Sequence, residues 1–369
     1  VSFAELGLLV AVMNVASGVS QLPAGMLVDR VGARPLLVGG LIAMGGGIAL
    51  MGFAPSYGFL LVLSALSGVG NSVFHPADYA VLGHAIKSDR VGRAFALHTF
   101  CGNVGFMIAP STILLLTALW GWRGAVIAAG SISIVVALAI LKWGRLLDPE
   151  KTLAQKAHDH QAGPSALSIR PLLTPSVLTM FLFFVVIAMI TSGFHSFAVT
   201  LLGKFHGQSL AAANTVFTAF LVAGSVGVLL GGAVADKTSR HGLFTGIVMA
   251  VGALGLFVMG QPGLSFAALF AILVVVGASQ GMIRPSRDMI VRSITPPGAT
   301  GRVFAFVSTG LNVGAAITPV AFGYMIDIGE VQAVFYIMSA IMLVGIATVG
   351  VTRWKSPVKL ADNAAGAGG

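Results

Sequence analysis

The sequence predicts an all-α membrane protein made of two similar helical bundles, and three observations predict it. Of the 369 residues, 56% are hydrophobic and only 9% are charged, whereas a soluble domain usually carries about 25% charged residues. The apolar residues form long runs without Asp, Glu, Lys or Arg. In addition, a short acidic phrase, Gly25 to Arg34, returns in similar form as Gly232 to Arg240, each time between two apolar runs.

The charge-free runs define the helices in order. They are Leu6–Val28, Pro35–Ala77, Ala94–Trp122, Gly124–Leu141, Pro171–Gly203, Phe205–Ala235, Gly242–Ile283, Val303–Ile326 and Val331–Thr352. A helix needs roughly 20 apolar residues to cross the hydrocarbon layer. Two runs are long enough to cross twice and contain turn signals, at Ala54-Pro55-Ser56 and Gln261-Pro262-Gly263. We therefore expect eleven crossings. A β-barrel would instead show alternating segments of about ten residues.

The positive charges predict the orientation in the membrane. The net charge is +9, and most Lys and Arg residues fall in alternate loops, while the opposite loops hold little more than Arg123 and Lys204. This asymmetry is typical of cytosolic loops, so it argues against nucleic-acid binding. We expect an integral protein of the plasma membrane, the inner membrane in a bacterium, with both acidic phrases in the cytosol. The single cysteine, Cys101, excludes a disulfide within the chain.

An internal repeat relates the two halves of the chain. His75 corresponds to Arg284, and Asn103 to Asn312, at one offset of 209 residues, while the acidic phrases match at 207. In the second half a helix near Pro175–Leu201 precedes the helix that leads to Asp236, but the first half has no such helix before Asp29. We therefore expect two pseudo-symmetric six-helix bundles with the first helix of the N-terminal bundle absent. A natural eleven-helix variant is the alternative.

The same comparison gives the domain bounds. We expect an N-terminal bundle over residues 1–146, a cytosolic linker over 147–172, a C-terminal bundle over 173–353 and a cytosolic tail over 354–369. His158, Asp159 and His160 lie in the linker. We interpret them as part of a solvated loop and predict no metal site, because no further ligands lie nearby.

The phrase Gly25-x-x-x-Asp29-Arg30-x-Gly32-x-Arg34, between the second and third helix of a half, resembles the signature of the major facilitator superfamily. The resemblance covers the whole chain, and its finer features are similar to bacterial drug-efflux members, including the fosmidomycin-resistance type. It implies two bundles that rock around a central cavity. It also implies that the acidic loops are conformational latches. Their residues are Gly25, Asp29, Arg30, Gly32 and Arg34 in the first loop and Gly232, Asp236, Lys237 and Arg240 in the second.

Two positions depart from patterns of the family. Many proton-driven members carry an Arg four residues before a Gly in the fourth helix, but here Ser64 precedes Gly68. Drug/proton exporters often carry Gly-Pro-x-x-Gly-Gly in the fifth helix, whereas this chain has only a similar stretch, from Gly102 to Pro110. These departures leave the coupling ion and the direction of transport open.

Several charged residues lie inside or beside the apolar runs. A charge deep in a bilayer costs about 2.5–3.5 kcal/mol on insertion scales, so we expect these residues to face a cavity or the cytosolic rim. Asp78 and Arg287 are equivalent in the repeat and have opposite charges. We hypothesise a cytosolic gate in which Asp78 pairs with Arg284 or Arg287 of the other half; local pairing at helix ends is the alternative. The gate and coupling candidates are His75, Asp78, Arg284, Arg287, Asp288, His98 and His195.

The two histidines inside apolar runs, His98 and His195, have a side chain that titrates near neutral pH, so either is a candidate to bind a coupling proton. Hydrogen bonding to a neighbouring helix is the alternative. Further polar residues are expected to line the cavity or to join helices: Asn14, Gln21, Asn71, Asn103, Asn214, Gln280 and Asn312. The pairs Gly227/Gly231 and Gly310/Gly314 predict close helix packing. Five phenylalanines are expected in the core or facing lipid rather than lining a substrate site: Phe181, Phe183, Phe184, Phe194 and Phe197.

The function classes follow from what the sequence contains. It has no phosphate-binding Gly-x-x-x-x-Gly-Lys-Ser/Thr loop, so we predict neither ATP hydrolysis nor any other enzymatic activity. We expect no cofactor, a proton or other ion gradient as the driving force, and a monomer in the lipid bilayer that binds a small-molecule substrate. The first hypothesis is an antiporter that exports a small, partly apolar compound in exchange for protons. The alternatives are an uptake symporter for a small organic anion, and a membrane sensor or scaffold without transport.

Overall fold

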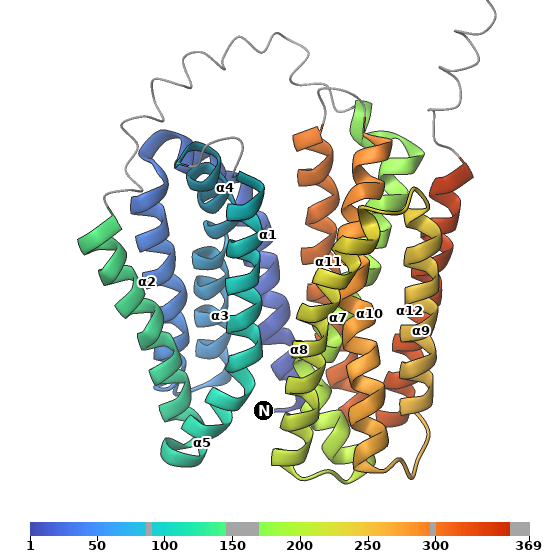
Figure 1. Ribbon diagram of the computed structural model, residues 1–369. Helices are drawn as coiled ribbons and strands as arrows, with labels where there is room; N and C mark the ends of the chain where they lie inside the picture. Colours follow the sequence, from blue (N-terminus) through green and yellow to red (C-terminus); the bar gives the residue numbers. More distant parts are fainter. Residues whose placement is uncertain (86–90, 145–169, 296–299, 355–369) are drawn as a thin grey trace, which may run out of the picture. The chain divides into compact units, whose positions relative to one another are not determined.

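Figure 1 shows the computed structural model of the protein, which describes residues 1–85, 91–144, 170–295 and 300–354. All secondary-structure elements in these ranges are helices, as the sequence predicted. The chain divides into two compact units, residues 1–167 and residues 168–369, and each is described by itself. The division falls within the segment predicted to be a linker, while the exact domain bounds stay a prediction.

The N-terminal unit is helical from its first residues. Its helices are α1 (Phe3–Val31), α2 (Ala33–Met51), α3 (Tyr57–Asn71), α4 (Phe74–Ala85) and α5 (Val91–Trp143). Ser2 starts α1 with a capping box: its hydroxyl accepts from the Glu5 amide at 3.1 Å, and the Glu5 carboxylate accepts from the Ser2 amide at 2.7 Å. Ser56 starts α3 by accepting from the Phe59 amide. The turn predicted between residues 54 and 56 is therefore confirmed.

Helix α5 is two helices joined at a sharp corner. It runs for 53 residues and breaks at Gly121, which has φ 68° and ψ 173°. In the described ranges ten helical stretches are long and apolar enough to cross a membrane, and one of them, Phe100–Trp143, is 44 residues long. That length is enough for two crossings. The predicted total of eleven counts this stretch twice and stays a prediction.

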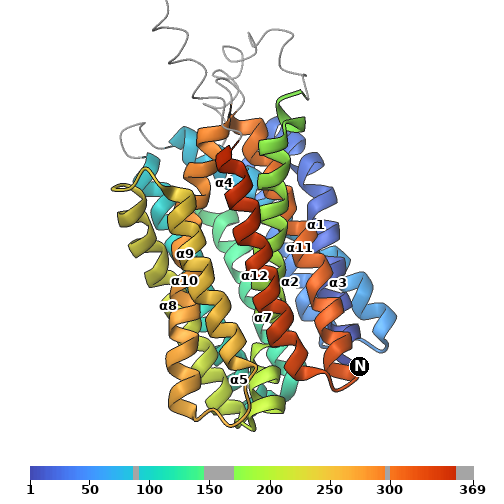
Figure 2. The ribbon, with the colours of Figure 1, turned by 90° about the vertical axis from the view of Figure 1, so that its right-hand side faces the viewer.

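The C-terminal unit repeats this pattern. Its elements are η4 (Arg170–Leu173), α7 (Pro175–His206), α8 (Leu210–Ala235), α9 (His241–Met259), α10 (Phe266–Ile294), α11 (Thr300–Asp327) and α12 (Val331–Trp354). Side-chain oxygens of Thr174, Ser209 and Ser265 cap α7, α8 and α10. The predicted turn at residues 261–263 separates α9 from α10. Figure 2 shows α12 beside α9 and α7, and it packs against both.

The repeat seen in the sequence is present in the packing. In the first unit α1 packs on α3 and α2 packs on α5; in the second, α8 packs on α10 and α9 packs on α12. Helix α7 covers α11 and α12. Within the described ranges of the first unit, no helix covers the first half of α5 in this way. Its Phe106 is 64% exposed, while Phe322 and Ile326 of α11 are buried.

Glycines bring the helices of the second unit close together, as the two predicted pairs require. A methyl group at Gly231 would lie 2.6 Å from Met282 Cα on α10, and one at Gly227 would meet the backbone of Ala278. On α11, Gly310 and Gly314 face the backbone of α7 in the same way. Both predictions of close packing are confirmed, because small residues let membrane helices approach to backbone contact.

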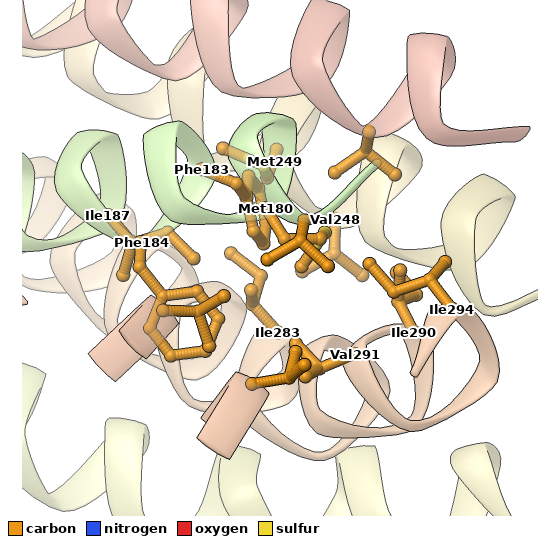
Figure 3. Close-up of a cluster of buried hydrophobic side chains, with 14 residues drawn as sticks. Met180, Phe183, Phe184, Ile187, Val248, Met249, Ile283, Ile290, Val291 and Ile294 are labelled. Carbon is orange, nitrogen blue, oxygen red and sulfur yellow. The ribbon is translucent and has the colours of Figure 1, made fainter. Parts of the chain in front are cut away.

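Figure 3 shows a cluster of buried apolar side chains in the C-terminal unit. Five helices contribute to it, with Phe183, Met249, Ile283, Val307 and Val349 among its buried side chains. The predicted core role of the phenylalanines is confirmed for Phe183, Phe184, Phe194 and Phe197, which are all buried. Phe181 is partly buried and stacks on Phe306 with the ring centroids 5.1 Å apart. This core holds α7, α9, α10, α11 and α12 as one body.

Candidate functional site

The first acidic phrase forms a tight corner between two helices. Helix α1 ends at Val31 and α2 begins at Ala33, so Gly32 alone makes the turn. Gly32 has φ 95° and ψ 163°, a region that is open essentially only to glycine. The phrase therefore needs a glycine here for a backbone reason. The side chain of Asp29 lies outside the described part of the structure, so its predicted latch role stays a prediction.

The two arginines of this phrase have different surroundings. Arg34 donates from Nη2 to the carbonyl oxygen of Leu141 at 2.6 Å, in the last turn of α5. A cation is stabilising where a helix leaves its carbonyls unpaired, so Arg34 ties the corner to the end of α5. Arg30 is exposed. The sequence treated the two arginines alike, because their order in the chain does not reveal which one faces α5.

The second acidic phrase is looser. Helix α8 ends at Ala235, and five residues separate it from α9 at His241. Asp236, Lys237 and Arg240 are all exposed. The amides of Asp236, Lys237 and Thr238 donate to carbonyls in the last turn of α8, and the Arg240 amide donates to the Thr238 hydroxyl at 3.1 Å. The two phrases are related in sequence but differ in conformation, because the second has no glycine at the place of Gly32.

A carboxylate and an imidazole meet in the N-terminal unit. His98 Nε2 on α5 lies 3.3 Å from Asp78 Oδ2 on α4. His75 lies one turn earlier on α4, and its charge also acts on Asp78. The predicted partners of Asp78, Arg284 and Arg287, belong to the other unit. That cross-unit gate stays a prediction, while the local alternative describes the contact that Asp78 makes within its own unit.

The charged residues of α10 form a compact group. Arg287 donates from Nε to Asp288 Oδ1 at 2.9 Å, and its guanidinium lies 4.4 Å from the centroid of the Phe184 ring. Its charge is therefore held by a carboxylate and an aromatic face. Arg284, one turn earlier, is exposed. Among the described residues Arg284 makes no ion-pair contact, although the charges of Arg287 and Asp288 act on it.

Polar side chains of α7 and α10 also meet within the C-terminal unit. Thr191 donates to Gln280 at 3.4 Å. His195, one turn beyond Thr191, lies edge-on to Phe217 and Phe220, each with its centroid 5.8 Å away. The charge of Arg284, one turn beyond Gln280, reaches His195. These four polar residues therefore lie in one stretch of α7 and α10, a grouping that the sequence did not predict because Thr191 carried no signal of its own.

The other predicted cavity residues serve varied roles. Asn71 donates to Ser17 at 3.0 Å and joins α3 to α1, and Asn14 donates to the carbonyl of Val10 in its own helix. Asn214 is buried. The remaining three are partly buried, and a cavity-lining role for them stays a prediction: Gln21, Asn103 and Asn312. Asn71 matches the alternative reading, in which a polar side chain joins two helices.

Two further observations concern metal and ion binding. In the described ranges no group of three or more His, Cys, Asp or Glu side chains is placed to hold a metal ion. The linker residues His158, Asp159 and His160 lie outside those ranges. Ser64 stands at the position where the resemblance described above would place an Arg in many proton-driven transporters. Its side chain is buried and donates to the Leu9 carbonyl on α1. A long cationic side chain would not fit into this contact.

Comparison with known families explains the repeat and the corner together. The family model described as Major Facilitator Superfamily matches residues 1–206 and 183–368. The chain belongs to the major facilitator superfamily. Proteins of this superfamily are membrane transporters rather than enzymes, which agrees with the absence of ATP-binding and catalytic motifs from the sequence. The chain is therefore an integral membrane protein of a transporter family, and it needs no cofactor.

Individual members of the superfamily resemble the chain along most of its length. The fosmidomycin resistance protein of Escherichia coli (strain K12) is 26% identical, over 94% of this chain and 84% of its own. The membrane sensor protein UhpC of the same organism is 25% identical, over 92% and 81%. A crystal structure of a bacterial homolog of the human lysosomal transporter Spinster matches the fold with a TM-score of 0.77 at 14% identity, over 97% of this chain and 90% of that one.

Proposed function

We propose that this member of the superfamily is a proton-coupled antiporter that works by alternating access and exports a small, partly apolar compound. The observation that carries the proposal is the whole-length likeness to a fosmidomycin resistance protein. The duplicated packing of the two units supports alternating access, since transporters of this kind rock one repeat against the other. The apolar composition, with 9% charged residues, supports a substrate that is partly apolar.

The two acidic loops act as latches in this proposal. The rigid corner at Gly32 and the bond from Arg34 to the end of α5 support it, because they make the first loop a fixed part of its unit. We further propose that the loops, the linker and the C-terminal tail face the cytosol, that the protein lies in the plasma or bacterial inner membrane, and that it acts as a monomer.

One observation favours the second candidate function, uptake of a small organic anion. Arg284 has no ion-pair contact among the described residues, and it lies near the polar side chains of Thr191, Gln280 and His195. A cation in such a place fits the carboxylate or phosphate group of a substrate. The chain also resembles a membrane sensor protein. A sensor without transport is therefore the third candidate, and the test below distinguishes it from the other two.

A growth assay tests the proposal. The chain is expressed in a fosmidomycin-sensitive bacterial strain, and the minimal inhibitory concentrations of fosmidomycin and of a panel of toxic compounds are measured. We expect resistance to at least one compound, its loss in Asp29→Asn, and its retention in Glu330→Gln, since Glu330 is an exposed carboxylate at the α11–α12 turn.

Uptake of labelled organic anions is measured in the same cells. Anion uptake without resistance would replace export by the second candidate. If the cells show neither resistance nor anion uptake, the result would favour a sensor without transport.

A further inference from the structure

In the N-terminal unit one carboxylate contacts an imidazole and lies one helical turn from a second. Asp78 on α4 contacts His98 Nε2 on α5 at 3.3 Å, and the charge of His75 also acts on it. The side chains of Asp78 and His98 are 23% and 48% exposed, so protons and water can reach the pair. Both residues lie seven positions from the facing ends of their helices, Ala85 and Val91. The two helices therefore bring them to the same level, about two turns from those ends.

No other described charge competes for this carboxylate. Helix α4 packs against α1, α2 and α5. The described charged side chains near this end are Arg30 on α1, which is exposed, Arg34 on α2, which donates to a carbonyl of α5, and Lys142 on α5, which lies over the ring of Trp143. Among the described residues, the charges that act on Asp78 are those of His98 and His75. An imidazole can bind and release a proton, so the charge beside the carboxylate can change.

The internal repeat shows that this group is specific to the first unit. At the offset of 209 residues, His75 corresponds to Arg284 and Asp78 to Arg287. His98 corresponds to Val307, which is fully buried. A guanidinium stays charged at any physiological pH. The C-terminal unit therefore has permanent charges at the positions of His75 and Asp78 and an apolar side chain at the position of His98.

We propose that Asp78, His98 and His75 form the site that binds the coupled proton. With the proton bound, Asp78 and His98 make a pair with no net charge; when the proton leaves to water, the pair carries one negative charge. A buried net charge is costly in hydrocarbon, so the protonated pair favours a state shielded from water and the deprotonated pair favours a state open to it. The inference rests on the proposed function, because it identifies the proton site of the same transporter.

The test measures the protonation of Asp78 and its neighbours directly, without substrate. Infrared difference spectra of the purified full-length protein in lipid vesicles are recorded between about pH 5 and pH 8. We expect carboxyl and imidazole signals that change with pH in the wild type. The carboxyl signal of Asp78 should be lost in Asp78→Asn, and the imidazole signal should be reduced in His98→Gln. Asp78→Glu should restore a carboxyl signal, and Glu330→Gln should leave the spectrum unchanged.

The outcomes are separable from those of the proposed function. If Asp78→Asn has the same titrating signals as the wild type, while circular dichroism shows that both are folded, the proton site is elsewhere and the inference is wrong. If the signals behave as expected but resistance does not depend on the pH gradient across the membrane, the site binds protons and the proposed coupling fails. Loss of the carboxyl signal in Asp78→Asn together with its recovery in Asp78→Glu supports the inference.

Discussion

Replacing Gly227 by alanine tests whether α8 and α10 are held at backbone contact. The new methyl group would lie 2.9 Å from Ala278 Cα and still closer to the carbonyl oxygen of that residue. Since these are backbone atoms, no side-chain rotation can relieve the contact, and the helices have to separate. Overpacking typically costs about 1–3 kcal/mol, while Gly→Ala in a helix gains up to about 1 kcal/mol. We expect a net loss of roughly 1–2 kcal/mol.

Gly232 on the same helix provides the matched control. Nothing lies within 4 Å of a methyl group placed there, so Gly232→Ala keeps the gain in helix propensity without the contact. Thermal unfolding of the purified variants in one detergent is followed by circular dichroism. Gly227→Ala should melt below the wild type, and Gly232→Ala at or above it. Equal melting temperatures for the two variants would refute the close packing of α8 on α10.

Three further changes test other parts of the structure. Gly32→Ala should lower stability by about 1–3 kcal/mol because Gly32 has a positive φ of 95°. Gly39→Ala in α2, where a methyl group would meet open space, should not lower stability. Thermal unfolding of the two variants, measured side by side, tests this difference. Arg34→Met should lower the melting temperature by removing the bond to Leu141, and Arg30→Met should leave it unchanged; a reversed order would contradict the assignment. In a Cys101→Ser background, Lys237→Cys should react with a membrane-impermeant thiol reagent from the cytosolic side only. Lys204→Cys should react from the opposite side only. Labelling of both cysteines from the same side would contradict the topology.

The arrangement of helices was largely predictable because lipid imposes simple rules. Runs of apolar residues had to be helices, and the Pro-containing turn signals near Pro55 and Pro262 lie where α2 and α9 give way to the next helix. The break between α3 and α4 at residues 72–73 was not predicted, since Ser72 and Val73 sit within one apolar run. The corner at Gly121 lies two residues before Arg123, the charge that separates the predicted runs Ala94–Trp122 and Gly124–Leu141, so this break was predicted to within two residues.

The site was predictable in its residue types but not in its pairs. Because the repeat relates Asp78 to Arg287, the predicted partner of Asp78 was an arginine in the other half of the chain. The contact with His98 depends instead on the hairpin of α4 and α5, which places residues 20 positions apart at one level. Hydropathy cannot indicate which faces of two apolar helices meet. Thr191 was missed for the same reason, although its bond to Gln280 joins α7 to α10.

Proton-driven transport in proteoliposomes tests the central claim most directly. Vesicles containing the purified protein are made acidic inside, and accumulation of labelled fosmidomycin, or of whichever compound the growth assay selects, is measured. Proton–substrate exchange predicts accumulation that a protonophore abolishes. Accumulation that the protonophore leaves unchanged, or that occurs only when the outside is acidic, would contradict the account.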